Sequence, residues 1–238
     1  MENSAAGKGV TPKIASEFLN GGVDILTGGN HIWQYREIIP FLAEEPRLIR
    51  PANYPDAPGV GAAVHCLESG RTLGVIQVEG RVFMRNLECP FKAIDTLLEQ
   101  MQDVNAILVD VHAEATSEKQ ALGWYLDGRV AGVFGTHTHV QTADERILPM
   151  GTAFITDAGM TGPYNSVIGM NRDNSLKKFF KDSSAKKHYP ALGEATISGL
   201  MVNADDETGF SKSGEVGIAR CNCRALCERR YWDCTESS

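Results

Sequence analysis

The sequence lacks the features that mark membrane and secreted proteins. Its longest apolar runs, such as Ala106–Val109 and Val130–Phe134, fall far short of the roughly 18 residues that a membrane-spanning helix needs. The first ten residues, MENSAAGKGV, have neither the basic region nor the apolar run of a secretory signal. We therefore expect a cytoplasmic protein with no transmembrane helix.

Positive charge is also scarce. The chain has 23 Lys and Arg against 30 Asp and Glu, which gives a net charge of −7. An acidic chain gains little from nonspecific contact with nucleic acid or an anionic membrane, so we expect no membrane partner and no stable nucleic-acid binding. If the protein handles phosphate, the positive charge must be supplied locally, and metal ions are the obvious source.

The six cysteines do not resemble a disulfide framework, because four of them lie in the last eighteen residues. From Cys221 onward the periodicity is lost and the composition changes abruptly. We therefore expect a domain over residues 1–220 and a disordered, cysteine-rich tail over residues 221–238. The alternative is a small metal knot, although its spacing departs from the paired arrangement of structural zinc. That knot would use Cys221, Cys223, Cys227 and Cys234.

Helix-like and strand-like segments alternate along the body of the chain. Helical spacing of apolar residues and helix-start signals predict four helices, over residues 12–20, 36–43, 91–101 and 117–125. Short apolar or alternating runs predict strands over residues 23–27, 62–67, 72–78, 106–111, 130–134 and 153–156, and a hairpin made of 197–202 and 215–219. This alternation favours a layered α/β fold.

Side chains that bind metals follow three of the predicted strands. Asn30 and His31 come after the strand over 23–27, and His112 ends the strand over 106–111. His137 and His139 follow the strand over 130–134, within the sequence GTHTH. Ligands in open α/β sheets bind beyond the carboxyl ends of strands, so these groups are expected to converge.

The donor types indicate which ion such a site would take. A lone histidine at a strand end is more often simply hydrogen-bonded, but three such strand ends together favour a shared metal site. Imidazole, amide and carboxylate groups suit Mn, Fe or Zn rather than Ca or Mg. His65 lies inside a strand and His188 in a lysine-rich loop, and we expect both to be structural or at the surface.

These motifs resemble those of a known family. GNH, a histidine after a buried strand, and GTHTH are similar to motifs of calcineurin-like metallophosphoesterases. More narrowly, the chain resembles the bacterial YmdB-type phosphodiesterases from about Glu2 to about Arg220. The segments that carry this resemblance are ENSAAGKG (2–9), HAEATSEK (112–119), GTHTHVQTAD (135–144), ILP (147–149) and ITDAGMTGP (155–163).

The resemblance implies a role for each matching residue. Glu2 matches a carboxylate that bridges two metal ions, and His31 matches a residue that donates a proton to the leaving oxygen. The ligands of one ion match Asn30, His112 and His137, and the positions associated with the other match Asn3 and His139. The implied activity is hydrolysis of cyclic nucleotides such as 2′,3′-cyclic AMP with two divalent ions, Fe or Mn, with Zn as the alternative.

The chain also departs from the family pattern. Family members begin with a strand that ends in a Gly-Asp motif, whose aspartate binds the first metal. The resemblance therefore implies a two-sheet sandwich flanked by helices, the metallophosphoesterase fold, without its first βαβ segment. On this interpretation one metal site is retained, the other is weak and turnover is slow. The alternatives are a non-catalytic remnant that binds a metal or nucleotide in regulation, and an interaction module built on the tail; a homo-oligomer stays open.

Several other polar residues have two interpretations. Arg50 either contacts phosphate or positions the loop that follows it. Glu114 and Glu118 either support the metal ligands or are solvated carboxylates at a helix start. We expect Thr138 to face away from the ligands on either side of it. Three aromatic residues either pack in the core or stack on a nucleobase: Trp33, Trp124 and Tyr164.

Overall fold

The computed structural model describes residues 1–205, 207–210 and 218–225, the last range by its backbone alone. Its helices are α1 (Pro12–Asn20), α2 (Ile38–Glu44), α3 (Pro90–Gln100), α4 (Thr116–Leu126) and α5 (Arg172–Phe179). Its strands are β1 (Leu26–Thr27), β2 (Leu48–Ile49), β3 (Ala62–Cys66), β4 (Thr72–Glu79), β5 (Ala106–His112), β6 (Gly132–Thr136), β7 (Arg146–Ile147), β8 (Ala153–Ile155), β9 (Ala195–Val202) and β10 (Ile218–Ala225). Within this part of the chain, no helix has the length and apolar character to span a bilayer.

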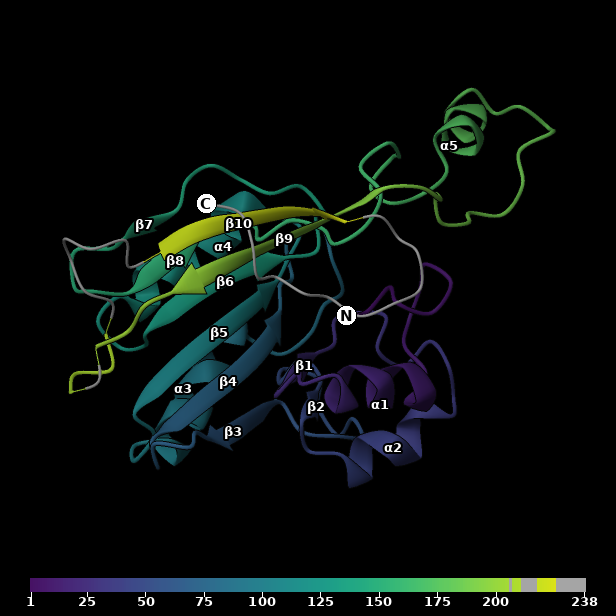
Figure 1. The fold of residues 1–238 in the computed structure, drawn as a ribbon. Helices are drawn as coiled ribbons and strands as arrows, with labels where there is room; N and C mark the ends of the chain where they lie inside the picture. Colours follow the sequence, from purple (N-terminus) through teal and green to yellow (C-terminus); the bar gives the residue numbers. More distant parts are fainter. Residues whose placement is uncertain (206, 211–217, 226–238) are drawn as a thin grey trace.

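Six strands form the main sheet, in the order β3-β4-β5-β6-β8-β7 (Figure 1). The four inner strands are parallel, and the edge strands β3 and β7 are antiparallel to their neighbours. In this register Glu79 pairs with His112, and His112 pairs with Thr136. The carboxyl ends of β4, β5 and β6 therefore lie side by side, as the α/β prediction requires.

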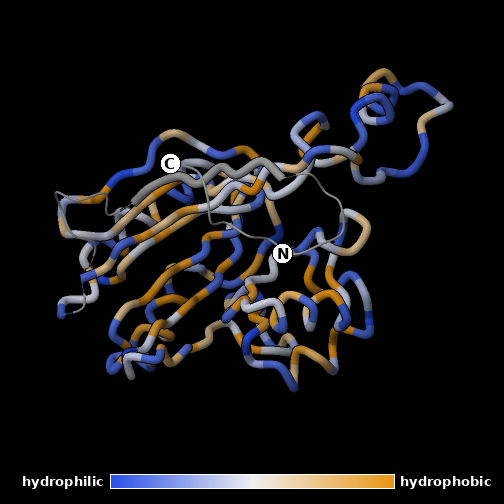
Figure 2. The backbone as a smooth tube through the Cα atoms, viewed as in Figure 1, coloured by the Kyte–Doolittle hydropathy of each residue, from blue (hydrophilic) through white to orange (hydrophobic). Residues whose placement is uncertain are grey.

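Two apolar clusters hold the fold together. The larger one packs Ile94 of α3 and Leu122 of α4 against buried strand residues such as Ile76 and Val109. The smaller one joins α1 and α2 to the parallel pair β1-β2, with Leu42 and Leu48 buried inside it. Hydrophobic segments are concentrated in these two regions in Figure 2. The polar residues of the site belong to these same two parts of the chain, the region of α1, α2 and β1-β2 and the main sheet.

Strand β9 pairs with β10 in an antiparallel hairpin, as the sequence predicts, from Ala195 opposite Ala225 to Val202 opposite Ile218. Close approaches occur at both ends of the hairpin, between Ser198 and Gly159 and between Gly209 and Asn105. Since Gly159 follows β8 and Asn105 precedes β5, the hairpin extends along the length of the main sheet. Strand β10 crosses the domain boundary predicted at residue 220, and residues 226–238 lie outside the described residues.

The predicted α/β class is confirmed, and the differences are local. Thr11 caps α1 as expected, since its hydroxyl accepts a hydrogen bond from the Ile14 N–H at 3.3 Å. The strand expected over residues 23–27 is reduced to Leu26–Thr27. Strands β2 and β7 and helix α5 were not predicted, because two-residue strands and a short, largely polar helix carry little apolar periodicity.

Candidate metal centre

Three side chains from distant parts of the chain meet at the carboxyl ends of β5 and β6. One ligand-type atom from each of Glu2, His112 and His137 lies within 4.8 Å of the other two. The Nε2 atom of His112 is 3.3 Å from Oε2 of Glu2 and 3.1 Å from Nδ1 of His137. Asn30 joins them, with its Oδ1 atom 3.2 Å from the same Nε2 atom. We call these four residues the His112 group.

A buried chain of hydrogen bonds fixes the tautomer of His112. Gln77 donates to Asp110 at 2.8 Å, and the hydroxyl of Thr136 donates to the other oxygen of Asp110 at 2.7 Å. Because the Thr136 hydroxyl already donates its proton to Asp110, its oxygen accepts a hydrogen bond from the Nδ1–H group of His112 at 2.9 Å. The Nε2 atom is then left with a bare lone pair.

That lone pair faces two oxygen acceptors, the carboxylate of Glu2 and the amide oxygen of Asn30. A hydrogen bond donated by Nδ1 of His137, 3.1 Å away, or a bound cation would relieve the repulsion among these atoms. Burial raises the pKa of Glu2, but a hydrogen bond from His112 when its Nε2 atom carries a proton, together with the His31 N–H, outweighs burial and lowers the pKa of Glu2 to about 2. The donor set therefore fits a divalent cation.

Asn3 and His139 form a second pair of ligand-type side chains, which we call the His139 group. The Nδ1 atom of His139 lies 2.9 Å from the carbonyl oxygen of Ile168, so it carries the proton and leaves Nε2 bare. The side-chain amide of Asn3 lies 3.0 Å from that Nε2 atom, and with Nε2 bare its nitrogen is the donor. In the rotated orientation the nitrogen instead donates to the carbonyls of Glu2 and Gly7, and the amide oxygen faces Nε2. An imidazole nitrogen and an amide therefore meet here as a second pair of potential ligands.

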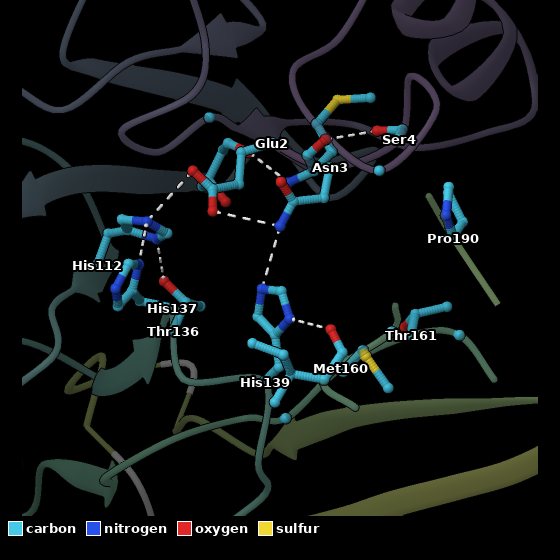
Figure 3. Close-up of a pocket in the computed structure, with 18 of the residues that line it drawn as sticks. Glu2, Asn3, Ser4, His112, Thr136, His137, His139, Met160, Thr161 and Pro190 are labelled. Atoms are coloured by element: carbon cyan, nitrogen blue, oxygen red, sulfur yellow. Dashed lines mark hydrogen bonds and ion pairs between the residues drawn. The ribbon is translucent and has the colours of Figure 1, made fainter. Parts of the chain in front are cut away.

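Glu2, a member of the His112 group, also reaches the His139 group (Figure 3). Its Oε2 atom faces His112 and accepts the backbone N–H of His31 at 3.0 Å, whereas its Oε1 atom lies 3.4 Å from the side-chain amide of Asn3. Gly29 allows this packing: a Cβ atom there would come within 2.4 Å of Oε2 of Glu2 and 2.8 Å of the His112 ring. The site thus requires glycine at this position.

The loop that carries His137 and His139 is strained and strongly anchored. Both residues have positive φ angles, 95° and 66°. Between them, Thr138 donates its hydroxyl to Asp157 at 2.7 Å, and Asp157 is paired with Lys119 at 2.7 Å. The side chains of Lys119 and Asp157 are each only 1% exposed. This buried pair therefore holds the loop in a conformation that it would otherwise adopt only rarely.

A cavity of about 550 Å³ adjoins both groups. Its walls include Glu2, Asn3, His112, His137 and His139, and residues 159–163, 168–170 and 190 complete one side. His31 is anchored beside Glu2 through its backbone, and burial lowers the pKa of its imidazole. His31 is not among the described residues that line this cavity, so the structure brings it next to the ligands but not into their shared wall.

For several residues to which the sequence assigns two possible roles, the structure decides between them. Arg50 donates to the carbonyls of Pro51, Ala52 and Ala57, so it positions its own loop. Glu114 lies 3.1 Å from Nε2 of His137 and supports that ring. Glu118 instead accepts the backbone N–H groups of residues 81 and 82, and thereby holds the loop after β4.

Thr138 points away from the ligands, as predicted, and bonds Asp157. The three aromatic residues do not stand over the cavity: Trp33 packs against Tyr54, Trp124 lies near Arg146, and Tyr164 bonds Ser198.

The supporting residues around the ligands were not predicted. These are Gln77, Asp110, Lys119, Thr136 and Asp157. One signal was available, because Gln77 and Asp110 are polar residues inside strands that otherwise read as apolar and buried. Such residues need buried partners, and here they are linked by hydrogen bonds to His112, a candidate ligand.

Comparison with known proteins places the chain in a family. Residues 1–216 match the family model described as YmdB-like protein. The chain belongs to the YmdB-like family. It is 48% identical over 209 residues to the 2′,3′-cyclic-nucleotide 2′-phosphodiesterase of Bacillus subtilis, and the match covers 87% of this chain and 78% of that relative.

Two crystal structures resemble this YmdB-like chain in fold. A hypothetical protein from Thermus thermophilus matches with a TM-score of 0.82 and 39% identity, over 95% of this chain and 85% of the other. A phosphatase from Mycoplasma pneumoniae matches with a TM-score of 0.82 and 31% identity, over 94% of this chain and 80% of the other. The predictions of the family and of a phosphoesterase are confirmed.

Proposed function

We propose that this YmdB-like chain is a metal-dependent phosphodiesterase that opens 2′,3′-cyclic nucleotides such as 2′,3′-cyclic AMP. The observation that carries the proposal is the convergence of bare lone pairs from His112, Asn30 and Glu2, with the His112 tautomer fixed by buried hydrogen bonds. The similarity to the Bacillus subtilis 2′,3′-cyclic-nucleotide 2′-phosphodiesterase supports this substrate class.

The two groups of ligands support a dinuclear site. The His112 group would hold one ion and the His139 group the other, with Glu2 shared through its two oxygens. Divalent cations bound there would neutralise phosphoryl oxygens and supply hydroxide at neutral pH. Imidazole, amide and carboxylate ligands favour Mn or Fe, with Zn as the alternative. We propose that the second ion is the weaker one, because the His139 group offers fewer buried ligands.

The remaining residues bind and orient the substrate. The cavity volume suits a nucleotide-sized ligand. His31 is held beside Glu2 and is proposed to protonate the ribose oxygen that leaves phosphorus. We further propose that the catalytic domain extends beyond residue 220 to include strand β10, and that the protein is cytoplasmic.

The test measures bound metal and turnover in the same samples. Metal content is determined by mass spectrometry, and hydrolysis of 2′,3′-cyclic AMP is followed with added Mn²⁺. We expect His112→Ala and His137→Ala to lose the tightly bound ion and to reduce kcat/KM at least about a hundredfold. His65→Ala is the matched control, because His65 lies on edge strand β3, outside the site.

Three results bear on the proposal. Metal binding without turnover would favour the remnant interpretation, in which the chain binds a metal or nucleotide in regulation. Loss of turnover in His65→Ala as large as in His112→Ala would contradict the assignment of the site. Two tightly bound ions with rapid turnover would overturn the proposal of a weak second site.

A further inference from the structure

A segment beside the cavity projects from the rest of the molecule. Residues 171–190, which we call the arm, include α5 and the loop that follows it (Figure 1). The two ends of the arm are held together by backbone hydrogen bonds from Asn171 to Tyr189 at 3.0 Å and from Ala191 to Gly169 at 2.9 Å. The arm is therefore a defined projection with both ends fixed at one place.

The charge of the arm is opposite to that of the chain. It contains six basic and two acidic residues, a net charge of +4 in a protein whose overall charge is −7. Its exposed lysines include Lys177, Lys181, Lys186 and Lys187. Among the described residues, no ion pair within 4.0 Å involves any of these four. Their charge is thus available to a partner.

Aromatic side chains are interleaved with these charges. Phe179 and Phe180 are 78% and 80% exposed. Exposed rings between lysines are the combination with which proteins bind single-stranded nucleic acid, where bases stack on rings and cations contact phosphates. An anionic membrane would satisfy the same charges, but it would not explain the position of the arm.

The arm begins at the wall of the cavity. Ile168, Met170 and Pro190 line the cavity together with His139, and the carbonyl of Ile168 accepts the hydrogen bond that orients His139. Lys177 lies on α5, five residues after its start at Arg172, which is a rise of about 8 Å along the helix. A ligand that fills the cavity and continues outward for one or two nucleotides would reach the arm.

We infer that the arm binds the strand of a single-stranded RNA whose 3′-terminal 2′,3′-cyclic phosphate occupies the cavity. This inference rests on the proposed function. A 2′,3′-cyclic phosphate needs a ribose with both hydroxyls, so a strand that ends in one is RNA. In the reaction, water adds to phosphorus, one ring P–O bond breaks, and the freed ribose oxygen takes a proton. The product strand keeps its phosphate as a monoester.

An RNA site on the arm departs from the expectation that composition gives. A net charge of −7 predicts no stable nucleic-acid binding, but that prediction averages over the whole chain. The arm concentrates basic residues at one place, and local charge decides where a polyanion binds.

The experiment compares two substrates with the same reactive group. We measure kcat/KM for 2′,3′-cyclic AMP and for a ten-nucleotide single-stranded RNA with a 3′-terminal 2′,3′-cyclic phosphate. The test variant is Lys177→Glu/Lys181→Glu, and the matched control is Lys13→Glu/Lys92→Glu, whose lysines are exposed on α1 and α3. A fluorescent RNA of the same sequence with a 3′-hydroxyl reports binding alone.

We expect the test variant to lower kcat/KM for the RNA at least about tenfold and to leave that for 2′,3′-cyclic AMP within twofold. The slope of log binding constant against log salt should weaken by about 1.4, because two phosphate contacts are lost. Phe179→Ser/Phe180→Ser should weaken RNA binding at least about fivefold by removing the stacking surface. The control variant should match the unmodified protein.

Other outcomes separate this inference from the proposed function. Normal hydrolysis of 2′,3′-cyclic AMP with RNA kinetics and binding unchanged by the test variant would overturn the inference alone. No hydrolysis of 2′,3′-cyclic AMP would defeat the proposed function, and lysine-dependent binding of the hydroxyl-ended RNA would still support the arm as an RNA site. Binding to phosphatidylglycerol vesicles without RNA binding would overturn the inference. The inference would also be overturned if Phe179→Ser/Phe180→Ser sedimented as a smaller assembly while its RNA binding stayed unchanged. The arm would then join copies of this chain.

Discussion

The two halves of the site differ in how their histidines are held. His112 is 2% exposed, and buried side chains fix its tautomer through Thr136 and Asp110. His139 is partly exposed, has a positive φ angle and is oriented by a single backbone carbonyl. The two groups thus offer similar ligand types, but hydrogen bonds hold His112 more firmly than His139. Because surrounding hydrogen bonds decide how well ligands are preorganised, we expect the two groups to differ in metal affinity although their ligand types are similar.

The largest expected effect comes from the buried pair that both halves share. Lys119→Met leaves the Asp157 carboxylate buried without its cation, and we expect a loss of about 3–5 kcal/mol in the free energy of unfolding. Chemical denaturation measures this loss. Lys92→Met, on the exposed face of α3, is the matched control and should change stability by less than about 0.5 kcal/mol. Equal losses of unfolding free energy in the two variants would contradict a stabilising role of the buried pair.

The next effect isolates the His112 half. Thr136→Val removes the hydroxyl between Asp110 and His112 without changing a ligand. We expect the affinity of the tighter ion to fall about 10- to 100-fold, because the ring loses its fixed tautomer. Competition with a fluorescent chelator measures that affinity. Thr96→Val is a suitable control, since Thr96 is exposed and its hydroxyl donates to the backbone carbonyl of Lys92 within its own helix. Unchanged affinity in Thr136→Val would remove the proposed basis of the difference.

A smaller effect is expected at the other half. His139→Ala should remove the proposed weaker ion and change the affinity of the tighter ion less than about threefold, because no hydrogen bond or ion pair among the described residues joins His139 to His112. Titration with Mn²⁺ followed by electron paramagnetic resonance counts the two classes of site. If both ions were lost together, the two groups would form one coupled site and the comparison between them would fail.

The smallest effect concerns acid stability on the side of the main sheet near His139. Asp144 accepts the N–H of Thr156 at 3.1 Å and its hydroxyl at 2.5 Å. Burial raises the pKa of Asp144, but these hydrogen bonds outweigh it and hold the pKa below the ordinary 3.8. Its stabilising contribution is therefore complete above pH 3.8 and lost as pH falls through the lower folded pKa.

Asp144→Asn should accordingly flatten the decline in stability below about pH 4. Denaturant unfolding between about pH 5 and about pH 3 measures this, and Asp173→Asn on the exposed arm is the control. A steeper decline in Asp144→Asn than in the unmodified protein would reverse the assigned sign.

Sequence reasoning grouped the candidate ligands because strand ends are visible in the sequence. His112 and His137 follow strong apolar runs, and parallel strands bring such positions to one edge of a sheet. The supporting network was not predictable in this way, because Gln77, Asp110 and Thr136 meet only through the register of three strands. Helix α5 was missed for the opposite reason: an exposed helix with little apolar periodicity gives no signal of burial.

Gly29 has a consequence for how this gene tolerates change. The residue has no side chain and takes part in no chemistry, yet the volume beside it belongs to the Glu2 carboxylate and the His112 ring. A saturation mutagenesis screen scored by cell phenotype should therefore find this codon as intolerant as those of the histidines. The lack of a side chain at Gly29 is thus required by the space that Glu2 and His112 occupy.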